Sequence, residues 1–502
     1  MALGAVALVC LGLHFWRLDA APSGFFVDEA GIGLAARGIA LDGRDEHGTA
    51  WPLFFQAFGE WKNPVEIYMV AAAVHLFGPS VAIIRAVPTG LALTTALVLG
   101  VIAWDLFRNR WLALGTFAVA ALLPWLFATG RLGFEAPAQP AALGIFLLLW
   151  LRAQRRHSYR YAAGAGLALA VSGYAYSTGR LFMPLLVVAL LVCAFPWHSE
   201  GRVAMCALVA ALGWLPALVF DQLHHHALTA RFNTISVFTD AHSPLDAAGR
   251  VWRVYSSALS PQFLFQSAPF IQGGELFVTL VPLLLIGLAA LWRHRHDPFW
   301  RLVAAGLVLA PVPAALTVDF GHQLRNLEAA PFWVLVAVLG AHEAWLILGR
   351  RHTWVVGALV VAMTLEAGGF MADYFSRYPD RIADWNDAGF DRAVAAAQQA
   401  SRSPGASGRV VISDTIIGGD ILYPWFAAEN LPDYRRAGLG ALGAEYGHFL
   451  SGLPEGTVVL AGPDERPGGA ALVSAVGLAY TDDWGRHQTR VVYRVWRVRA
   501  SL

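Results

Sequence analysis

Apolar stretches separated by short polar connections run along the chain from Met1 to Phe370. A helix of roughly twenty apolar residues is long enough to cross a bilayer, so this pattern predicts about eleven spanning helices. We place them at Met1–Trp16, Val81–Ala103, Trp111–Ala128, Pro137–Leu151, Tyr161–Tyr174, Leu181–Pro196, Val203–Phe220, Leu276–Trp292, Leu302–Leu316, Pro331–Leu346 and Trp354–Phe370. A further apolar stretch, Pro64–Phe77, is short, and we interpret it as a re-entrant or interfacial helix, with a full crossing as the alternative.

The pattern changes after Phe370. One stretch, Ala388–Ala400, is typical of a helix, and three β-branched stretches are typical of strands. These strands are Arg409–Ser413, Thr457–Ala461 and Val491–Val498. We therefore predict a transmembrane domain over 1–370 and a small soluble α/β domain over 371–502. The G-x-x-x-x-G-K pattern of a phosphate loop is missing around Gly418 and Gly419, and nothing else in this tail indicates catalysis.

Composition agrees with a membrane protein, because 57% of the residues are hydrophobic and only 14% are charged. The net charge is +1 and no basic arm is present, which argues against a nucleic-acid partner. All three cysteines (Cys10, Cys193 and Cys206) lie in apolar stretches, so neither a disulfide framework nor a cysteine zinc site is indicated. The first stretch has no basic residue before it and no cleavage site, so we interpret it as a spanning helix rather than a signal peptide.

The distribution of arginine predicts the orientation, because cytoplasmic connections carry the excess of basic residues. Five connections form the basic set: Arg108–Arg110, Arg152–Arg160, Arg202, Arg293–Arg301 and Arg350–Arg351. The alternate connections carry single arginines. This places the first outer loop (17–63), a second long loop (221–274) and the tail domain on the extracytoplasmic side of a plasma or inner membrane.

Two adjacent acids, Asp28 and Glu29, follow the apolar residues Phe25, Phe26 and Val27 in the first outer loop. A carboxylate held near the membrane surface is partly desolvated, which raises its pKa and suits it to act as a general base. The alternative is structural: Asp28 caps a following helix over 30–40, and Glu29 complements the helix dipole. Spacing alone favours the structural role.

A second candidate is Lys62, which is the only lysine in the chain and lies just before Pro64. Its ammonium group can meet a phosphate as a point charge, or it can serve as an interfacial anchor. A short outer loop also carries Arg131 and Glu135, which can pair with each other or frame an active site.

Further candidates lie at the outer ends of spans: Tyr176, Arg180, His322 and Arg325. Each alone is most simply an interfacial anchor. Three short outer connections that each present one arginine nevertheless suit an anionic phosphate headgroup. The three consecutive histidines at 224–226 point in different directions on a helix, and no carboxylate or cysteine partner has ligand spacing, so no metal site is indicated, although a divalent ion stays possible.

An acidic pair after the first span resembles the GT-C superfamily of membrane glycosyltransferases, and especially its protein O-mannosyltransferase and lipid A aminoarabinose transferase branch. The turn at 62–64 resembles the family's Lys-Pro-Pro or His-Pro-Pro turn, with Asn63 in place of one proline. Phe77-Gly78 followed by Arg85 and Pro88, the 131–135 loop and the 322–325 segment are also similar to family patterns. The resemblance covers the chain to about Phe370 and does not include the tail.

The resemblance implies a transfer of a sugar from a polyprenyl-phosphate donor in the bilayer to an acceptor hydroxyl or phosphate on a protein, glycolipid or cell-wall glycan. It implies that Asp28 is the general base and that Glu29 orients the site. Lys62, Arg131, Arg180 and Arg325 would hold the carrier phosphate, with Glu135, Tyr176 and His322 nearby, and no cofactor is implied. One displacement at the anomeric carbon would invert its configuration.

Two other classes of protein are consistent with many spans. A transporter or flippase usually carries ionisable groups at mid-membrane depth, whereas Arg85, Asp105 and Glu366 lie near the ends of the predicted spans. A scaffold that displays the tail domain leaves the pattern of Asp28, Lys62 and Arg131 without a purpose. The enzyme is therefore the preferred hypothesis, with the transporter as the alternative.

Overall fold

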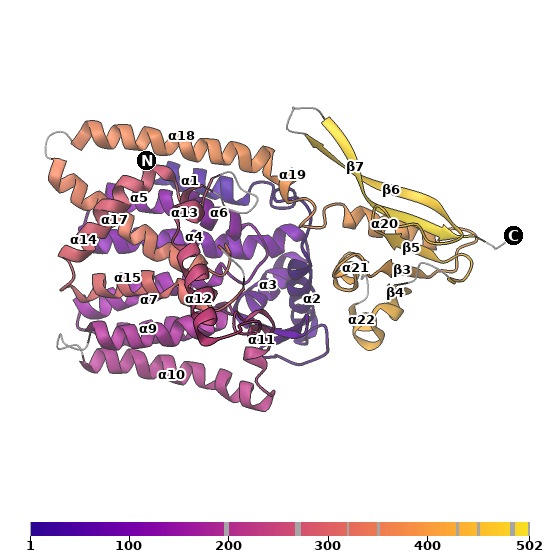
Figure 1. The fold of residues 1–502 in the computed structure, drawn as a ribbon, viewed down its shortest axis with the longest axis horizontal. Coiled ribbons are helices and arrows are strands. Elements are labelled where there is room, and N and C mark those ends of the chain that lie inside the picture. The colour runs from indigo at the N-terminus through magenta and orange to yellow at the C-terminus, as the bar shows by residue number, and fades with distance from the viewer. Residues whose placement is uncertain are drawn as a thin grey trace. The chain divides into compact units, whose positions relative to one another are not determined.

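The computed structural model describes residues 2–194, 200–266, 273–318, 321–348, 352–427, 431–448, 452–481 and 487–499 (Figure 1). The chain divides into two compact units, each made of several segments. Unit 1 comprises Met1–Trp16, Leu53–Glu66 and Arg85–Tyr374. Unit 2 comprises Arg17–Pro52, Ile67–Ile84 and Phe375–Leu502. Most of the first outer loop thus groups with the tail, while Lys62 belongs to unit 1.

Helices form most of unit 1, and within the described residues each predicted span coincides with one helix or with a broken pair of helices. Their bounds are α1 Ala2–Phe15, α4 Val81–Phe107, α5 Arg110–Leu122, α6 Pro124–Gly130, α7 Ala138–Arg155, α8 Tyr159–Ala175, α9 Gly179–Ala194, α10 Glu200–Leu223, α14 Val281–Arg293, α15 Pro298–Leu309, α16 Pro311–Ala315, α17 Ala330–Leu348 and α18 His352–Ser376. Helices α7, α9 and α10 lie one below another in Figure 1, and α8 contacts all three.

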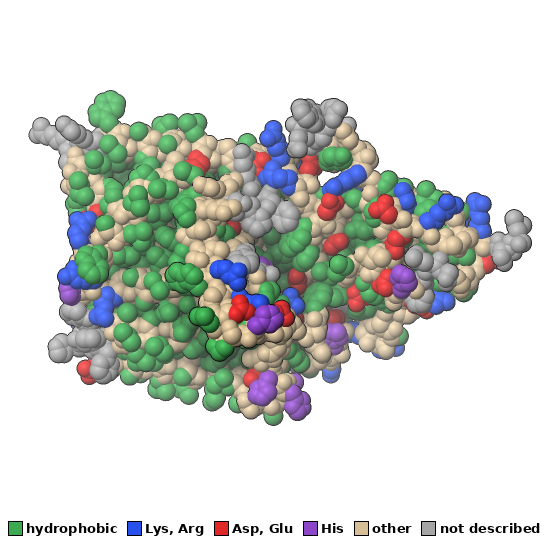
Figure 2. All heavy atoms as spheres, viewed as in Figure 1, with side chains coloured by type: hydrophobic (Ala, Val, Ile, Leu, Met, Phe, Trp, Pro, Cys, Tyr) green, Lys and Arg blue, Asp and Glu red, His purple; other side chains and the backbone are tan. Residues whose placement is uncertain are grey.

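Five stretches of helix in the described residues are long and apolar enough to cross a membrane. They are Val81–Phe107, Glu200–Leu223, Pro298–Ala315, Leu327–Leu348 and Trp354–Ser376. Hydrophobic side chains predominate on the surface over α9, α10 and α14 in Figure 2, as lipid-facing helices require. The chain is a membrane protein, and the total of about eleven spans stays a prediction.

One predicted span, Trp111–Ala128, is broken in the structure. Helices α5 and α6 meet at Leu123 with a bend of 52°. Leu123 has the extended conformation that a following proline imposes, and Pro124 cannot donate a helical hydrogen bond. Counted as one crossing, this pair raises the number of candidate spans to six.

Glycines allow α14 and α17 to pack closely. A methyl group on Gly340 would lie 1.8 Å from the carbonyl oxygen of Leu283, and one on Gly287 would lie 2.0 Å from that of Val336. Such close approach of backbones is how helices associate in lipid, where the hydrophobic effect between helices is absent.

Short helices make up the connection between α10 and α14. They are η2 Ala227–Thr229, α11 Ala230–Ile235, α12 Pro244–Ala258, α13 Pro261–Phe265 and η3 Val278–Leu280. A β-bridge joins Ser236 to Thr317, and the N–H group of Val237 donates to the carbonyl oxygen of Leu316. The long connection is therefore tied to the chain that follows α16.

Unit 2 contains a five-stranded sheet in the order β4-β3-β5-β7-β6. Strand β3 is parallel to β4 and β5, whereas β7 is antiparallel to β5 and β6. The strands are β3 Val410–Ser413, β4 Ala444–Gly447, β5 Val458–Ala461, β6 Ala470–Thr481 and β7 His487–Val498. Unit 2 also contains the α-helices α2 Val27–Asp42, α19 Tyr378–Ile382, α20 Phe390–Ser401, α21 Gly419–Ala427 and α22 Leu431–Ala437, the 3-10 helix η6 Gly438–Leu442, most of α3 Pro64–Phe77 and the first residues of α4.

The predicted strands of the tail are confirmed as β3, β5 and the larger part of β7, and the predicted helix is confirmed as α20. Two strands, β4 and β6, were missed. Both are rich in alanine and glycine, which have low β propensity. Their pairing with β3 and β7 makes them strands, and that pairing is a tertiary contact.

Candidate active site

A hairpin presents Lys62 at its end. Strands β1 (Phe55–Ala57) and β2 (Glu60–Lys62) are antiparallel, with Phe55 opposite Lys62. The two residues of the turn, Phe58 and Gly59, both have positive φ, which is the backbone that tight two-residue hairpins require. Helix α3 starts two residues after Lys62, with Pro64 in its first position.

The Lys62 ammonium group lies in a small charged cluster. Its Nζ is 3.0 Å from Glu60 Oε1 and 5.2 Å from the centre of the Phe58 ring. The other carboxylate oxygen of Glu60 is 3.4 Å from Arg231 Nε. Because 17% of the Lys62 side chain is exposed, this cation is partly accessible to an incoming anion.

Asn63 joins an acid to a guanidinium group. Its backbone N–H donates to Glu135 Oε1 at 2.7 Å, and its Nδ2 donates to Glu135 Oε2 at 2.9 Å. Its Oδ1 accepts from Arg180 Nη2 at 3.0 Å. Asn63 is fully buried. An amide, which is donor on one side and acceptor on the other, satisfies both partners, and proline at this position satisfies neither.

Glu135 lies in the loop between α6 and α7 and is buried. Burial raises the pKa of its carboxyl group, and the charges of Lys62 and Arg180 together with the two hydrogen bonds from Asn63 oppose that increase. The carboxylate therefore depends on these partners for its charge.

Arg180 lies at the start of α9, where the helix dipole is unfavourable to a cation. Its guanidinium donates to the carbonyl oxygens of Trp61 at 2.8 Å and Leu228 at 2.7 Å, and lies 5.3 Å from the Phe54 ring centre. Glu135, Glu60 and Asp221 supply the negative charges that act on it. Arg180 thus connects strand β2, helix η2 and Asn63. These contacts hold its guanidinium near the hairpin that carries Lys62.

Arg131 has different partners. Its guanidinium is fully buried and donates to the carbonyl oxygens of Leu13 at 3.0 Å and Trp16 at 2.7 Å, and to that of His14. These carbonyls end helix α1, so Arg131 caps that helix and compensates the negative end of its dipole. The pairing of Arg131 with Glu135 that spacing allowed is replaced by the Asn63–Glu135 pair.

The predicted loop residues His322 and Arg325 lie close to each other. Arg325 Nη1 donates to Thr317 Oγ1 at 2.8 Å, and its backbone N–H donates to His322 Nδ1 at 3.4 Å. Both side chains are half-buried. Asp319 and Phe320, which precede this loop in the sequence, lie outside the described residues.

Tyr176 follows the end of α8 in an extended conformation and is half-buried. The next residue, Ser177, accepts a 3.4 Å hydrogen bond from Asn63 Nδ2. The Tyr176 turn therefore borders the Asn63 network.

Sequence reasoning missed a second buried network in unit 1. Glu328 Oε2 accepts from Gln139 Nε2 and from Thr178 Oγ1, each at 2.5 Å. Among the described residues Glu328 Oε1 has no hydrogen-bond partner. Gln139 and Thr178 lie in the sequence close to Glu135 and Arg180, but only the fold brings Glu328 to them.

Asp28 and Glu29 belong to unit 2. The helix that contains them, α2, begins at Val27, so Asp28 lies inside its first turn and is not the cap that spacing suggested. Glu29 is buried, and its carboxylate accepts from the backbone N–H of Phe26 at 3.0 Å, which is the glutamate half of a capping box. Asp28 is half-buried. Phe26 stacks on Trp385 with ring centres 4.1 Å apart.

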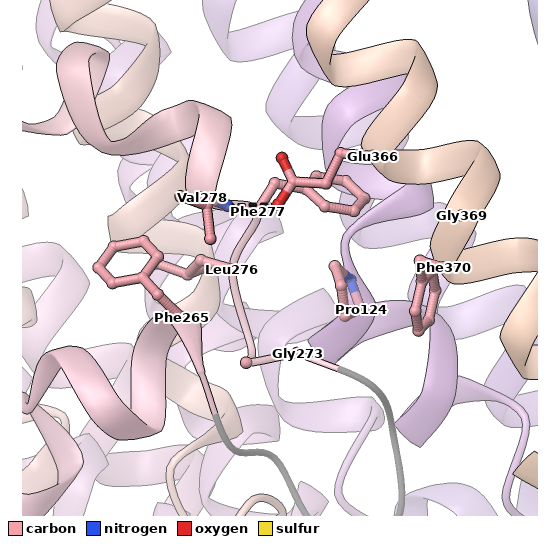
Figure 3. A pocket seen from close by; sticks show the side chains of 10 residues that line it. Pro124, Phe265, Gly273, Leu276, Phe277, Val278, Glu366, Gly369 and Phe370 are labelled. Carbon is pink, nitrogen blue, oxygen red and sulfur yellow. Dashed lines mark hydrogen bonds between the residues drawn. The ribbon is translucent and has the colours of Figure 1, made fainter.

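A cavity of about 230 Å³ lies elsewhere in unit 1, between α18 and the segment 273–278 (Figure 3). Its lining is mainly apolar and includes Pro124 and Phe370. The Glu366 carboxylate accepts from the backbone N–H groups of Val278 at 2.6 Å and Thr279 at 3.0 Å. Glu366 thus caps η3, and the residues of the Asn63 network do not line this cavity. Within the described residues no group of His, Cys, Asp and Glu could hold a metal ion.

The fold, a helical membrane unit with a small C-terminal sheet domain, is similar to that of solved protein structures. The crystal structure of ArnT from Cupriavidus metallidurans bound to undecaprenyl phosphate is similar, with a TM-score of 0.56 and 13% identity over 98% of this chain and 97% of that one. Its apo state gives a TM-score of 0.55 with the same identity and coverage. The apo oligosaccharyltransferase of Archaeoglobus fulgidus gives 0.48 at 14% identity, over 97% of this chain and 74% of that one.

At 13% identity the likeness to the two ArnT structures shows the fold alone. No protein-family model matches the chain, and no curated protein matches it either.

Proposed function

We propose that this protein is a glycosyltransferase that moves a sugar from a polyprenyl-phosphate donor to an acceptor. The observation that carries the proposal is the pair of cations Lys62 and Arg180. Asn63, the residue after Lys62, accepts a hydrogen bond from Arg180 and donates one to Glu135. A buried framework that holds cations in place suits a phosphate whose charge increases during reaction. Similarity to ArnT, solved with undecaprenyl phosphate, supports the lipid donor.

The reaction is a single displacement. Asp28 takes the proton of the acceptor hydroxyl, and the acceptor oxygen then forms a bond to the anomeric carbon. The bond from that carbon to the carrier phosphate breaks, and its electron pair leaves with the phosphate. Attack opposite the leaving group inverts the configuration.

The two acids have different tasks in this scheme. Glu29 is occupied by its bond to the Phe26 N–H group and orients the start of α2. Asp28 is half-buried, so part of its surface is accessible to an acceptor hydroxyl.

The cations also differ. Arg180 uses its donors on two carbonyls and on Asn63, so it organises the site, while the partly exposed Lys62 meets the carrier phosphate. Arg325 and His322 form a further donor-binding loop, and Tyr176 borders the site. Arg131 acts through the end of α1 rather than on the phosphate.

The remaining parts of the proposal concern topology. About eleven spans result when α1, α7, α8, α9, α14 and the broken pair of α5 and α6 are counted with the five longer ones. The transmembrane domain over 1–370 carries the reaction on the extracytoplasmic face of the cell membrane. The domain over 371–502 and the loop 221–274 help to select the acceptor.

A transporter of a lipid-linked anion is the second candidate. Glu328 is a buried ionisable group at the beginning of the candidate span Leu327–Leu348, although transport sites usually place such groups at mid-membrane depth. Transport leaves the substrate covalently unchanged, which separates the two functions.

The test is sugar release from radiolabelled polyprenyl-phosphate hexoses by the purified protein. Transfer or slow hydrolysis by the parent, with loss in Asp28→Asn and Lys62→Met, supports the enzyme. The control Asp19→Asn makes the same change at an exposed acid of the same loop and should keep activity. Movement of the intact lipid across vesicles without a covalent product would refute the enzyme and favour the transporter.

A further inference from the structure

Helix α12 (Pro244–Ala258) has two apolar faces. Pro244 occupies its first position, and Ser243 caps it by accepting from the Asp246 N–H group at 3.1 Å. Ala247, Val254 and Ala258, at spacings of seven and four, are buried on one face.

The opposite face of α12 is exposed. Leu245 and Trp252 are seven residues apart, and therefore share a face, with 83% and 66% of their surface exposed. Large apolar side chains that lie together on a surface generally mark an interaction site. In the region of α12, Figure 2 shows hydrophobic side chains next to basic ones.

Contacts place α12 beside a membrane-crossing helix. The Tyr255 hydroxyl donates to the carbonyl oxygen of Val308 at 2.9 Å, and α12 packs on α16. Val308 lies near the end of α15, inside the candidate span Pro298–Ala315. Val308 is itself exposed, so α12 adjoins an exposed apolar part of this candidate span.

The side chains of this face suit a bilayer interface. The rings of Trp252 and Tyr255 stack with centres 6.0 Å apart, and aromatic rings of this kind are enriched at the level of lipid headgroups. Arg253 is exposed beside them, whereas Arg250 pairs with Asp246 at 3.1 Å. An amphipathic helix with Trp and Leu on one side and arginine beside them is typical of interfacial helices.

We propose that α12 lies in the membrane–water interface, with Leu245 and Trp252 inserted among acyl chains and Arg253 at the lipid phosphates. The helix is also tied to a loop of the candidate site, since Ser257 Oγ accepts from the Gly321 N–H group at 3.2 Å, directly before His322. The bilayer thereby supports the position of the 321–325 loop. The insertion of α12 does not depend on the proposed enzymatic function.

The test uses the full-length protein in phosphatidylcholine vesicles that contain phosphatidylglycerol. An environment-sensitive fluorophore is attached to Leu245→Cys or Trp252→Cys, in a chain whose buried cysteines Cys10, Cys193 and Cys206 are replaced by alanine. Arg253→Cys is the matched control, since it is an exposed position on the polar side of the same helix.

We expect doxyl-labelled lipid to quench the probe at 245 and 252 at least twofold more than at 253, and aqueous iodide to show the reverse order. Equal access of iodide to all three positions would overturn the proposal. Protection from both lipid and iodide at 245 and 252 would also overturn it, because a protein would then cover the face. Each labelled variant must elute as the parent does, and a probe on either of the two apolar positions suffices.

Discussion

Exchange of Asn63 for aspartate probes the site with the smallest change in shape. The side chain keeps its acceptor toward Arg180 but loses the donor that lies 2.9 Å from Glu135 Oε2. A hydrogen bond to a charged group contributes about 1.5–3 kcal/mol, and its loss is one part of the effect. The other part is a second carboxylate at the position of the amide.

The size of the second part depends on protonation. Two charges about 3 Å apart repel by roughly 5 kcal/mol at an effective dielectric constant of about 20. Protonating a carboxylate of ordinary pKa at pH 7 costs roughly 4 kcal/mol, and the raised pKa of Glu135 lowers that cost. The two carboxylates of the variant, at positions 63 and 135, therefore bind one proton between them, because protonation costs less free energy than the repulsion.

The shared proton determines the pH dependence. Below the pKa of the pair a carboxylic acid donates to its neighbour and replaces the lost hydrogen bond. Above the pKa of the pair, the free-energy cost of keeping the proton bound increases by about 1.4 kcal/mol per pH unit. We expect Asn63→Asp to lose about 2–3 kcal/mol at pH 7, which is roughly a 30- to 150-fold lower kcat/KM, and to recover toward the parent near pH 5.

The assay is sugar transfer or donor hydrolysis between pH 5 and pH 8, together with thermal unfolding in detergent. Asn109→Asp is the matched control. Among the described residues Asn109 hydrogen-bonds through its acceptor alone, to the N–H groups of Trp111 and Leu112, and aspartate caps a helix as well. A loss that is equal at every pH, or parental activity throughout, would refute the reasoning about Glu135.

Three other expectations concern stability. Arg131→Met leaves the last carbonyls of α1 without their donor, and we expect a loss of about 3 kcal/mol and a lower thermal midpoint, with little effect of added donor lipid. Gly340→Ala places a methyl group 1.8 Å from the Leu283 carbonyl and should lower the midpoint by several degrees, whereas Gly357→Ala, with open space, should not. Burial raises the pKa of Glu46 to about 8, so between about pH 4.5 and pH 8 unfolding releases its proton. The free energy of unfolding therefore falls as pH rises through that window. Glu46→Gln should remove this pH dependence, and an unchanged pH dependence would contradict the burial of Glu46.

The acidic pair, Asp28 and Glu29, shows how much of a residue's role its position in the sequence predicts. Adjacent acids before a helix predicted either a cap or a catalytic base, and the structure gives the capping bond to Glu29. Which of the two acids makes the capping bond depends on where the helix begins, and it begins at Val27, three residues before the predicted start. The start of a helix is decided within a few residues by local packing, here including the stack of Phe26 on Trp385, far away in sequence.

The candidate phosphate site was only partly predictable. Lys62 and Arg180 stood out because each is an isolated cation at the end of an apolar stretch. Their framework did not, because Asn63 looked like a departure from a proline turn. The side-chain amide of Asn63 hydrogen-bonds to Glu135 and Arg180, which lie 72 and 117 positions away in the sequence.

The sequence by itself determined where the long helices of unit 1 lie. A helix in lipid makes its backbone hydrogen bonds internally and needs apolar side chains, so it is visible in the sequence as a continuous apolar stretch. The sequence also determined the single cations at the ends of those stretches. Only the tertiary structure decided which partner each charge has: Arg131 goes to the end of α1, and Glu135 goes to Asn63. Hydrogen bonds act over about 3 Å and require aligned groups, so partners distant in sequence are selected only when the fold brings them together.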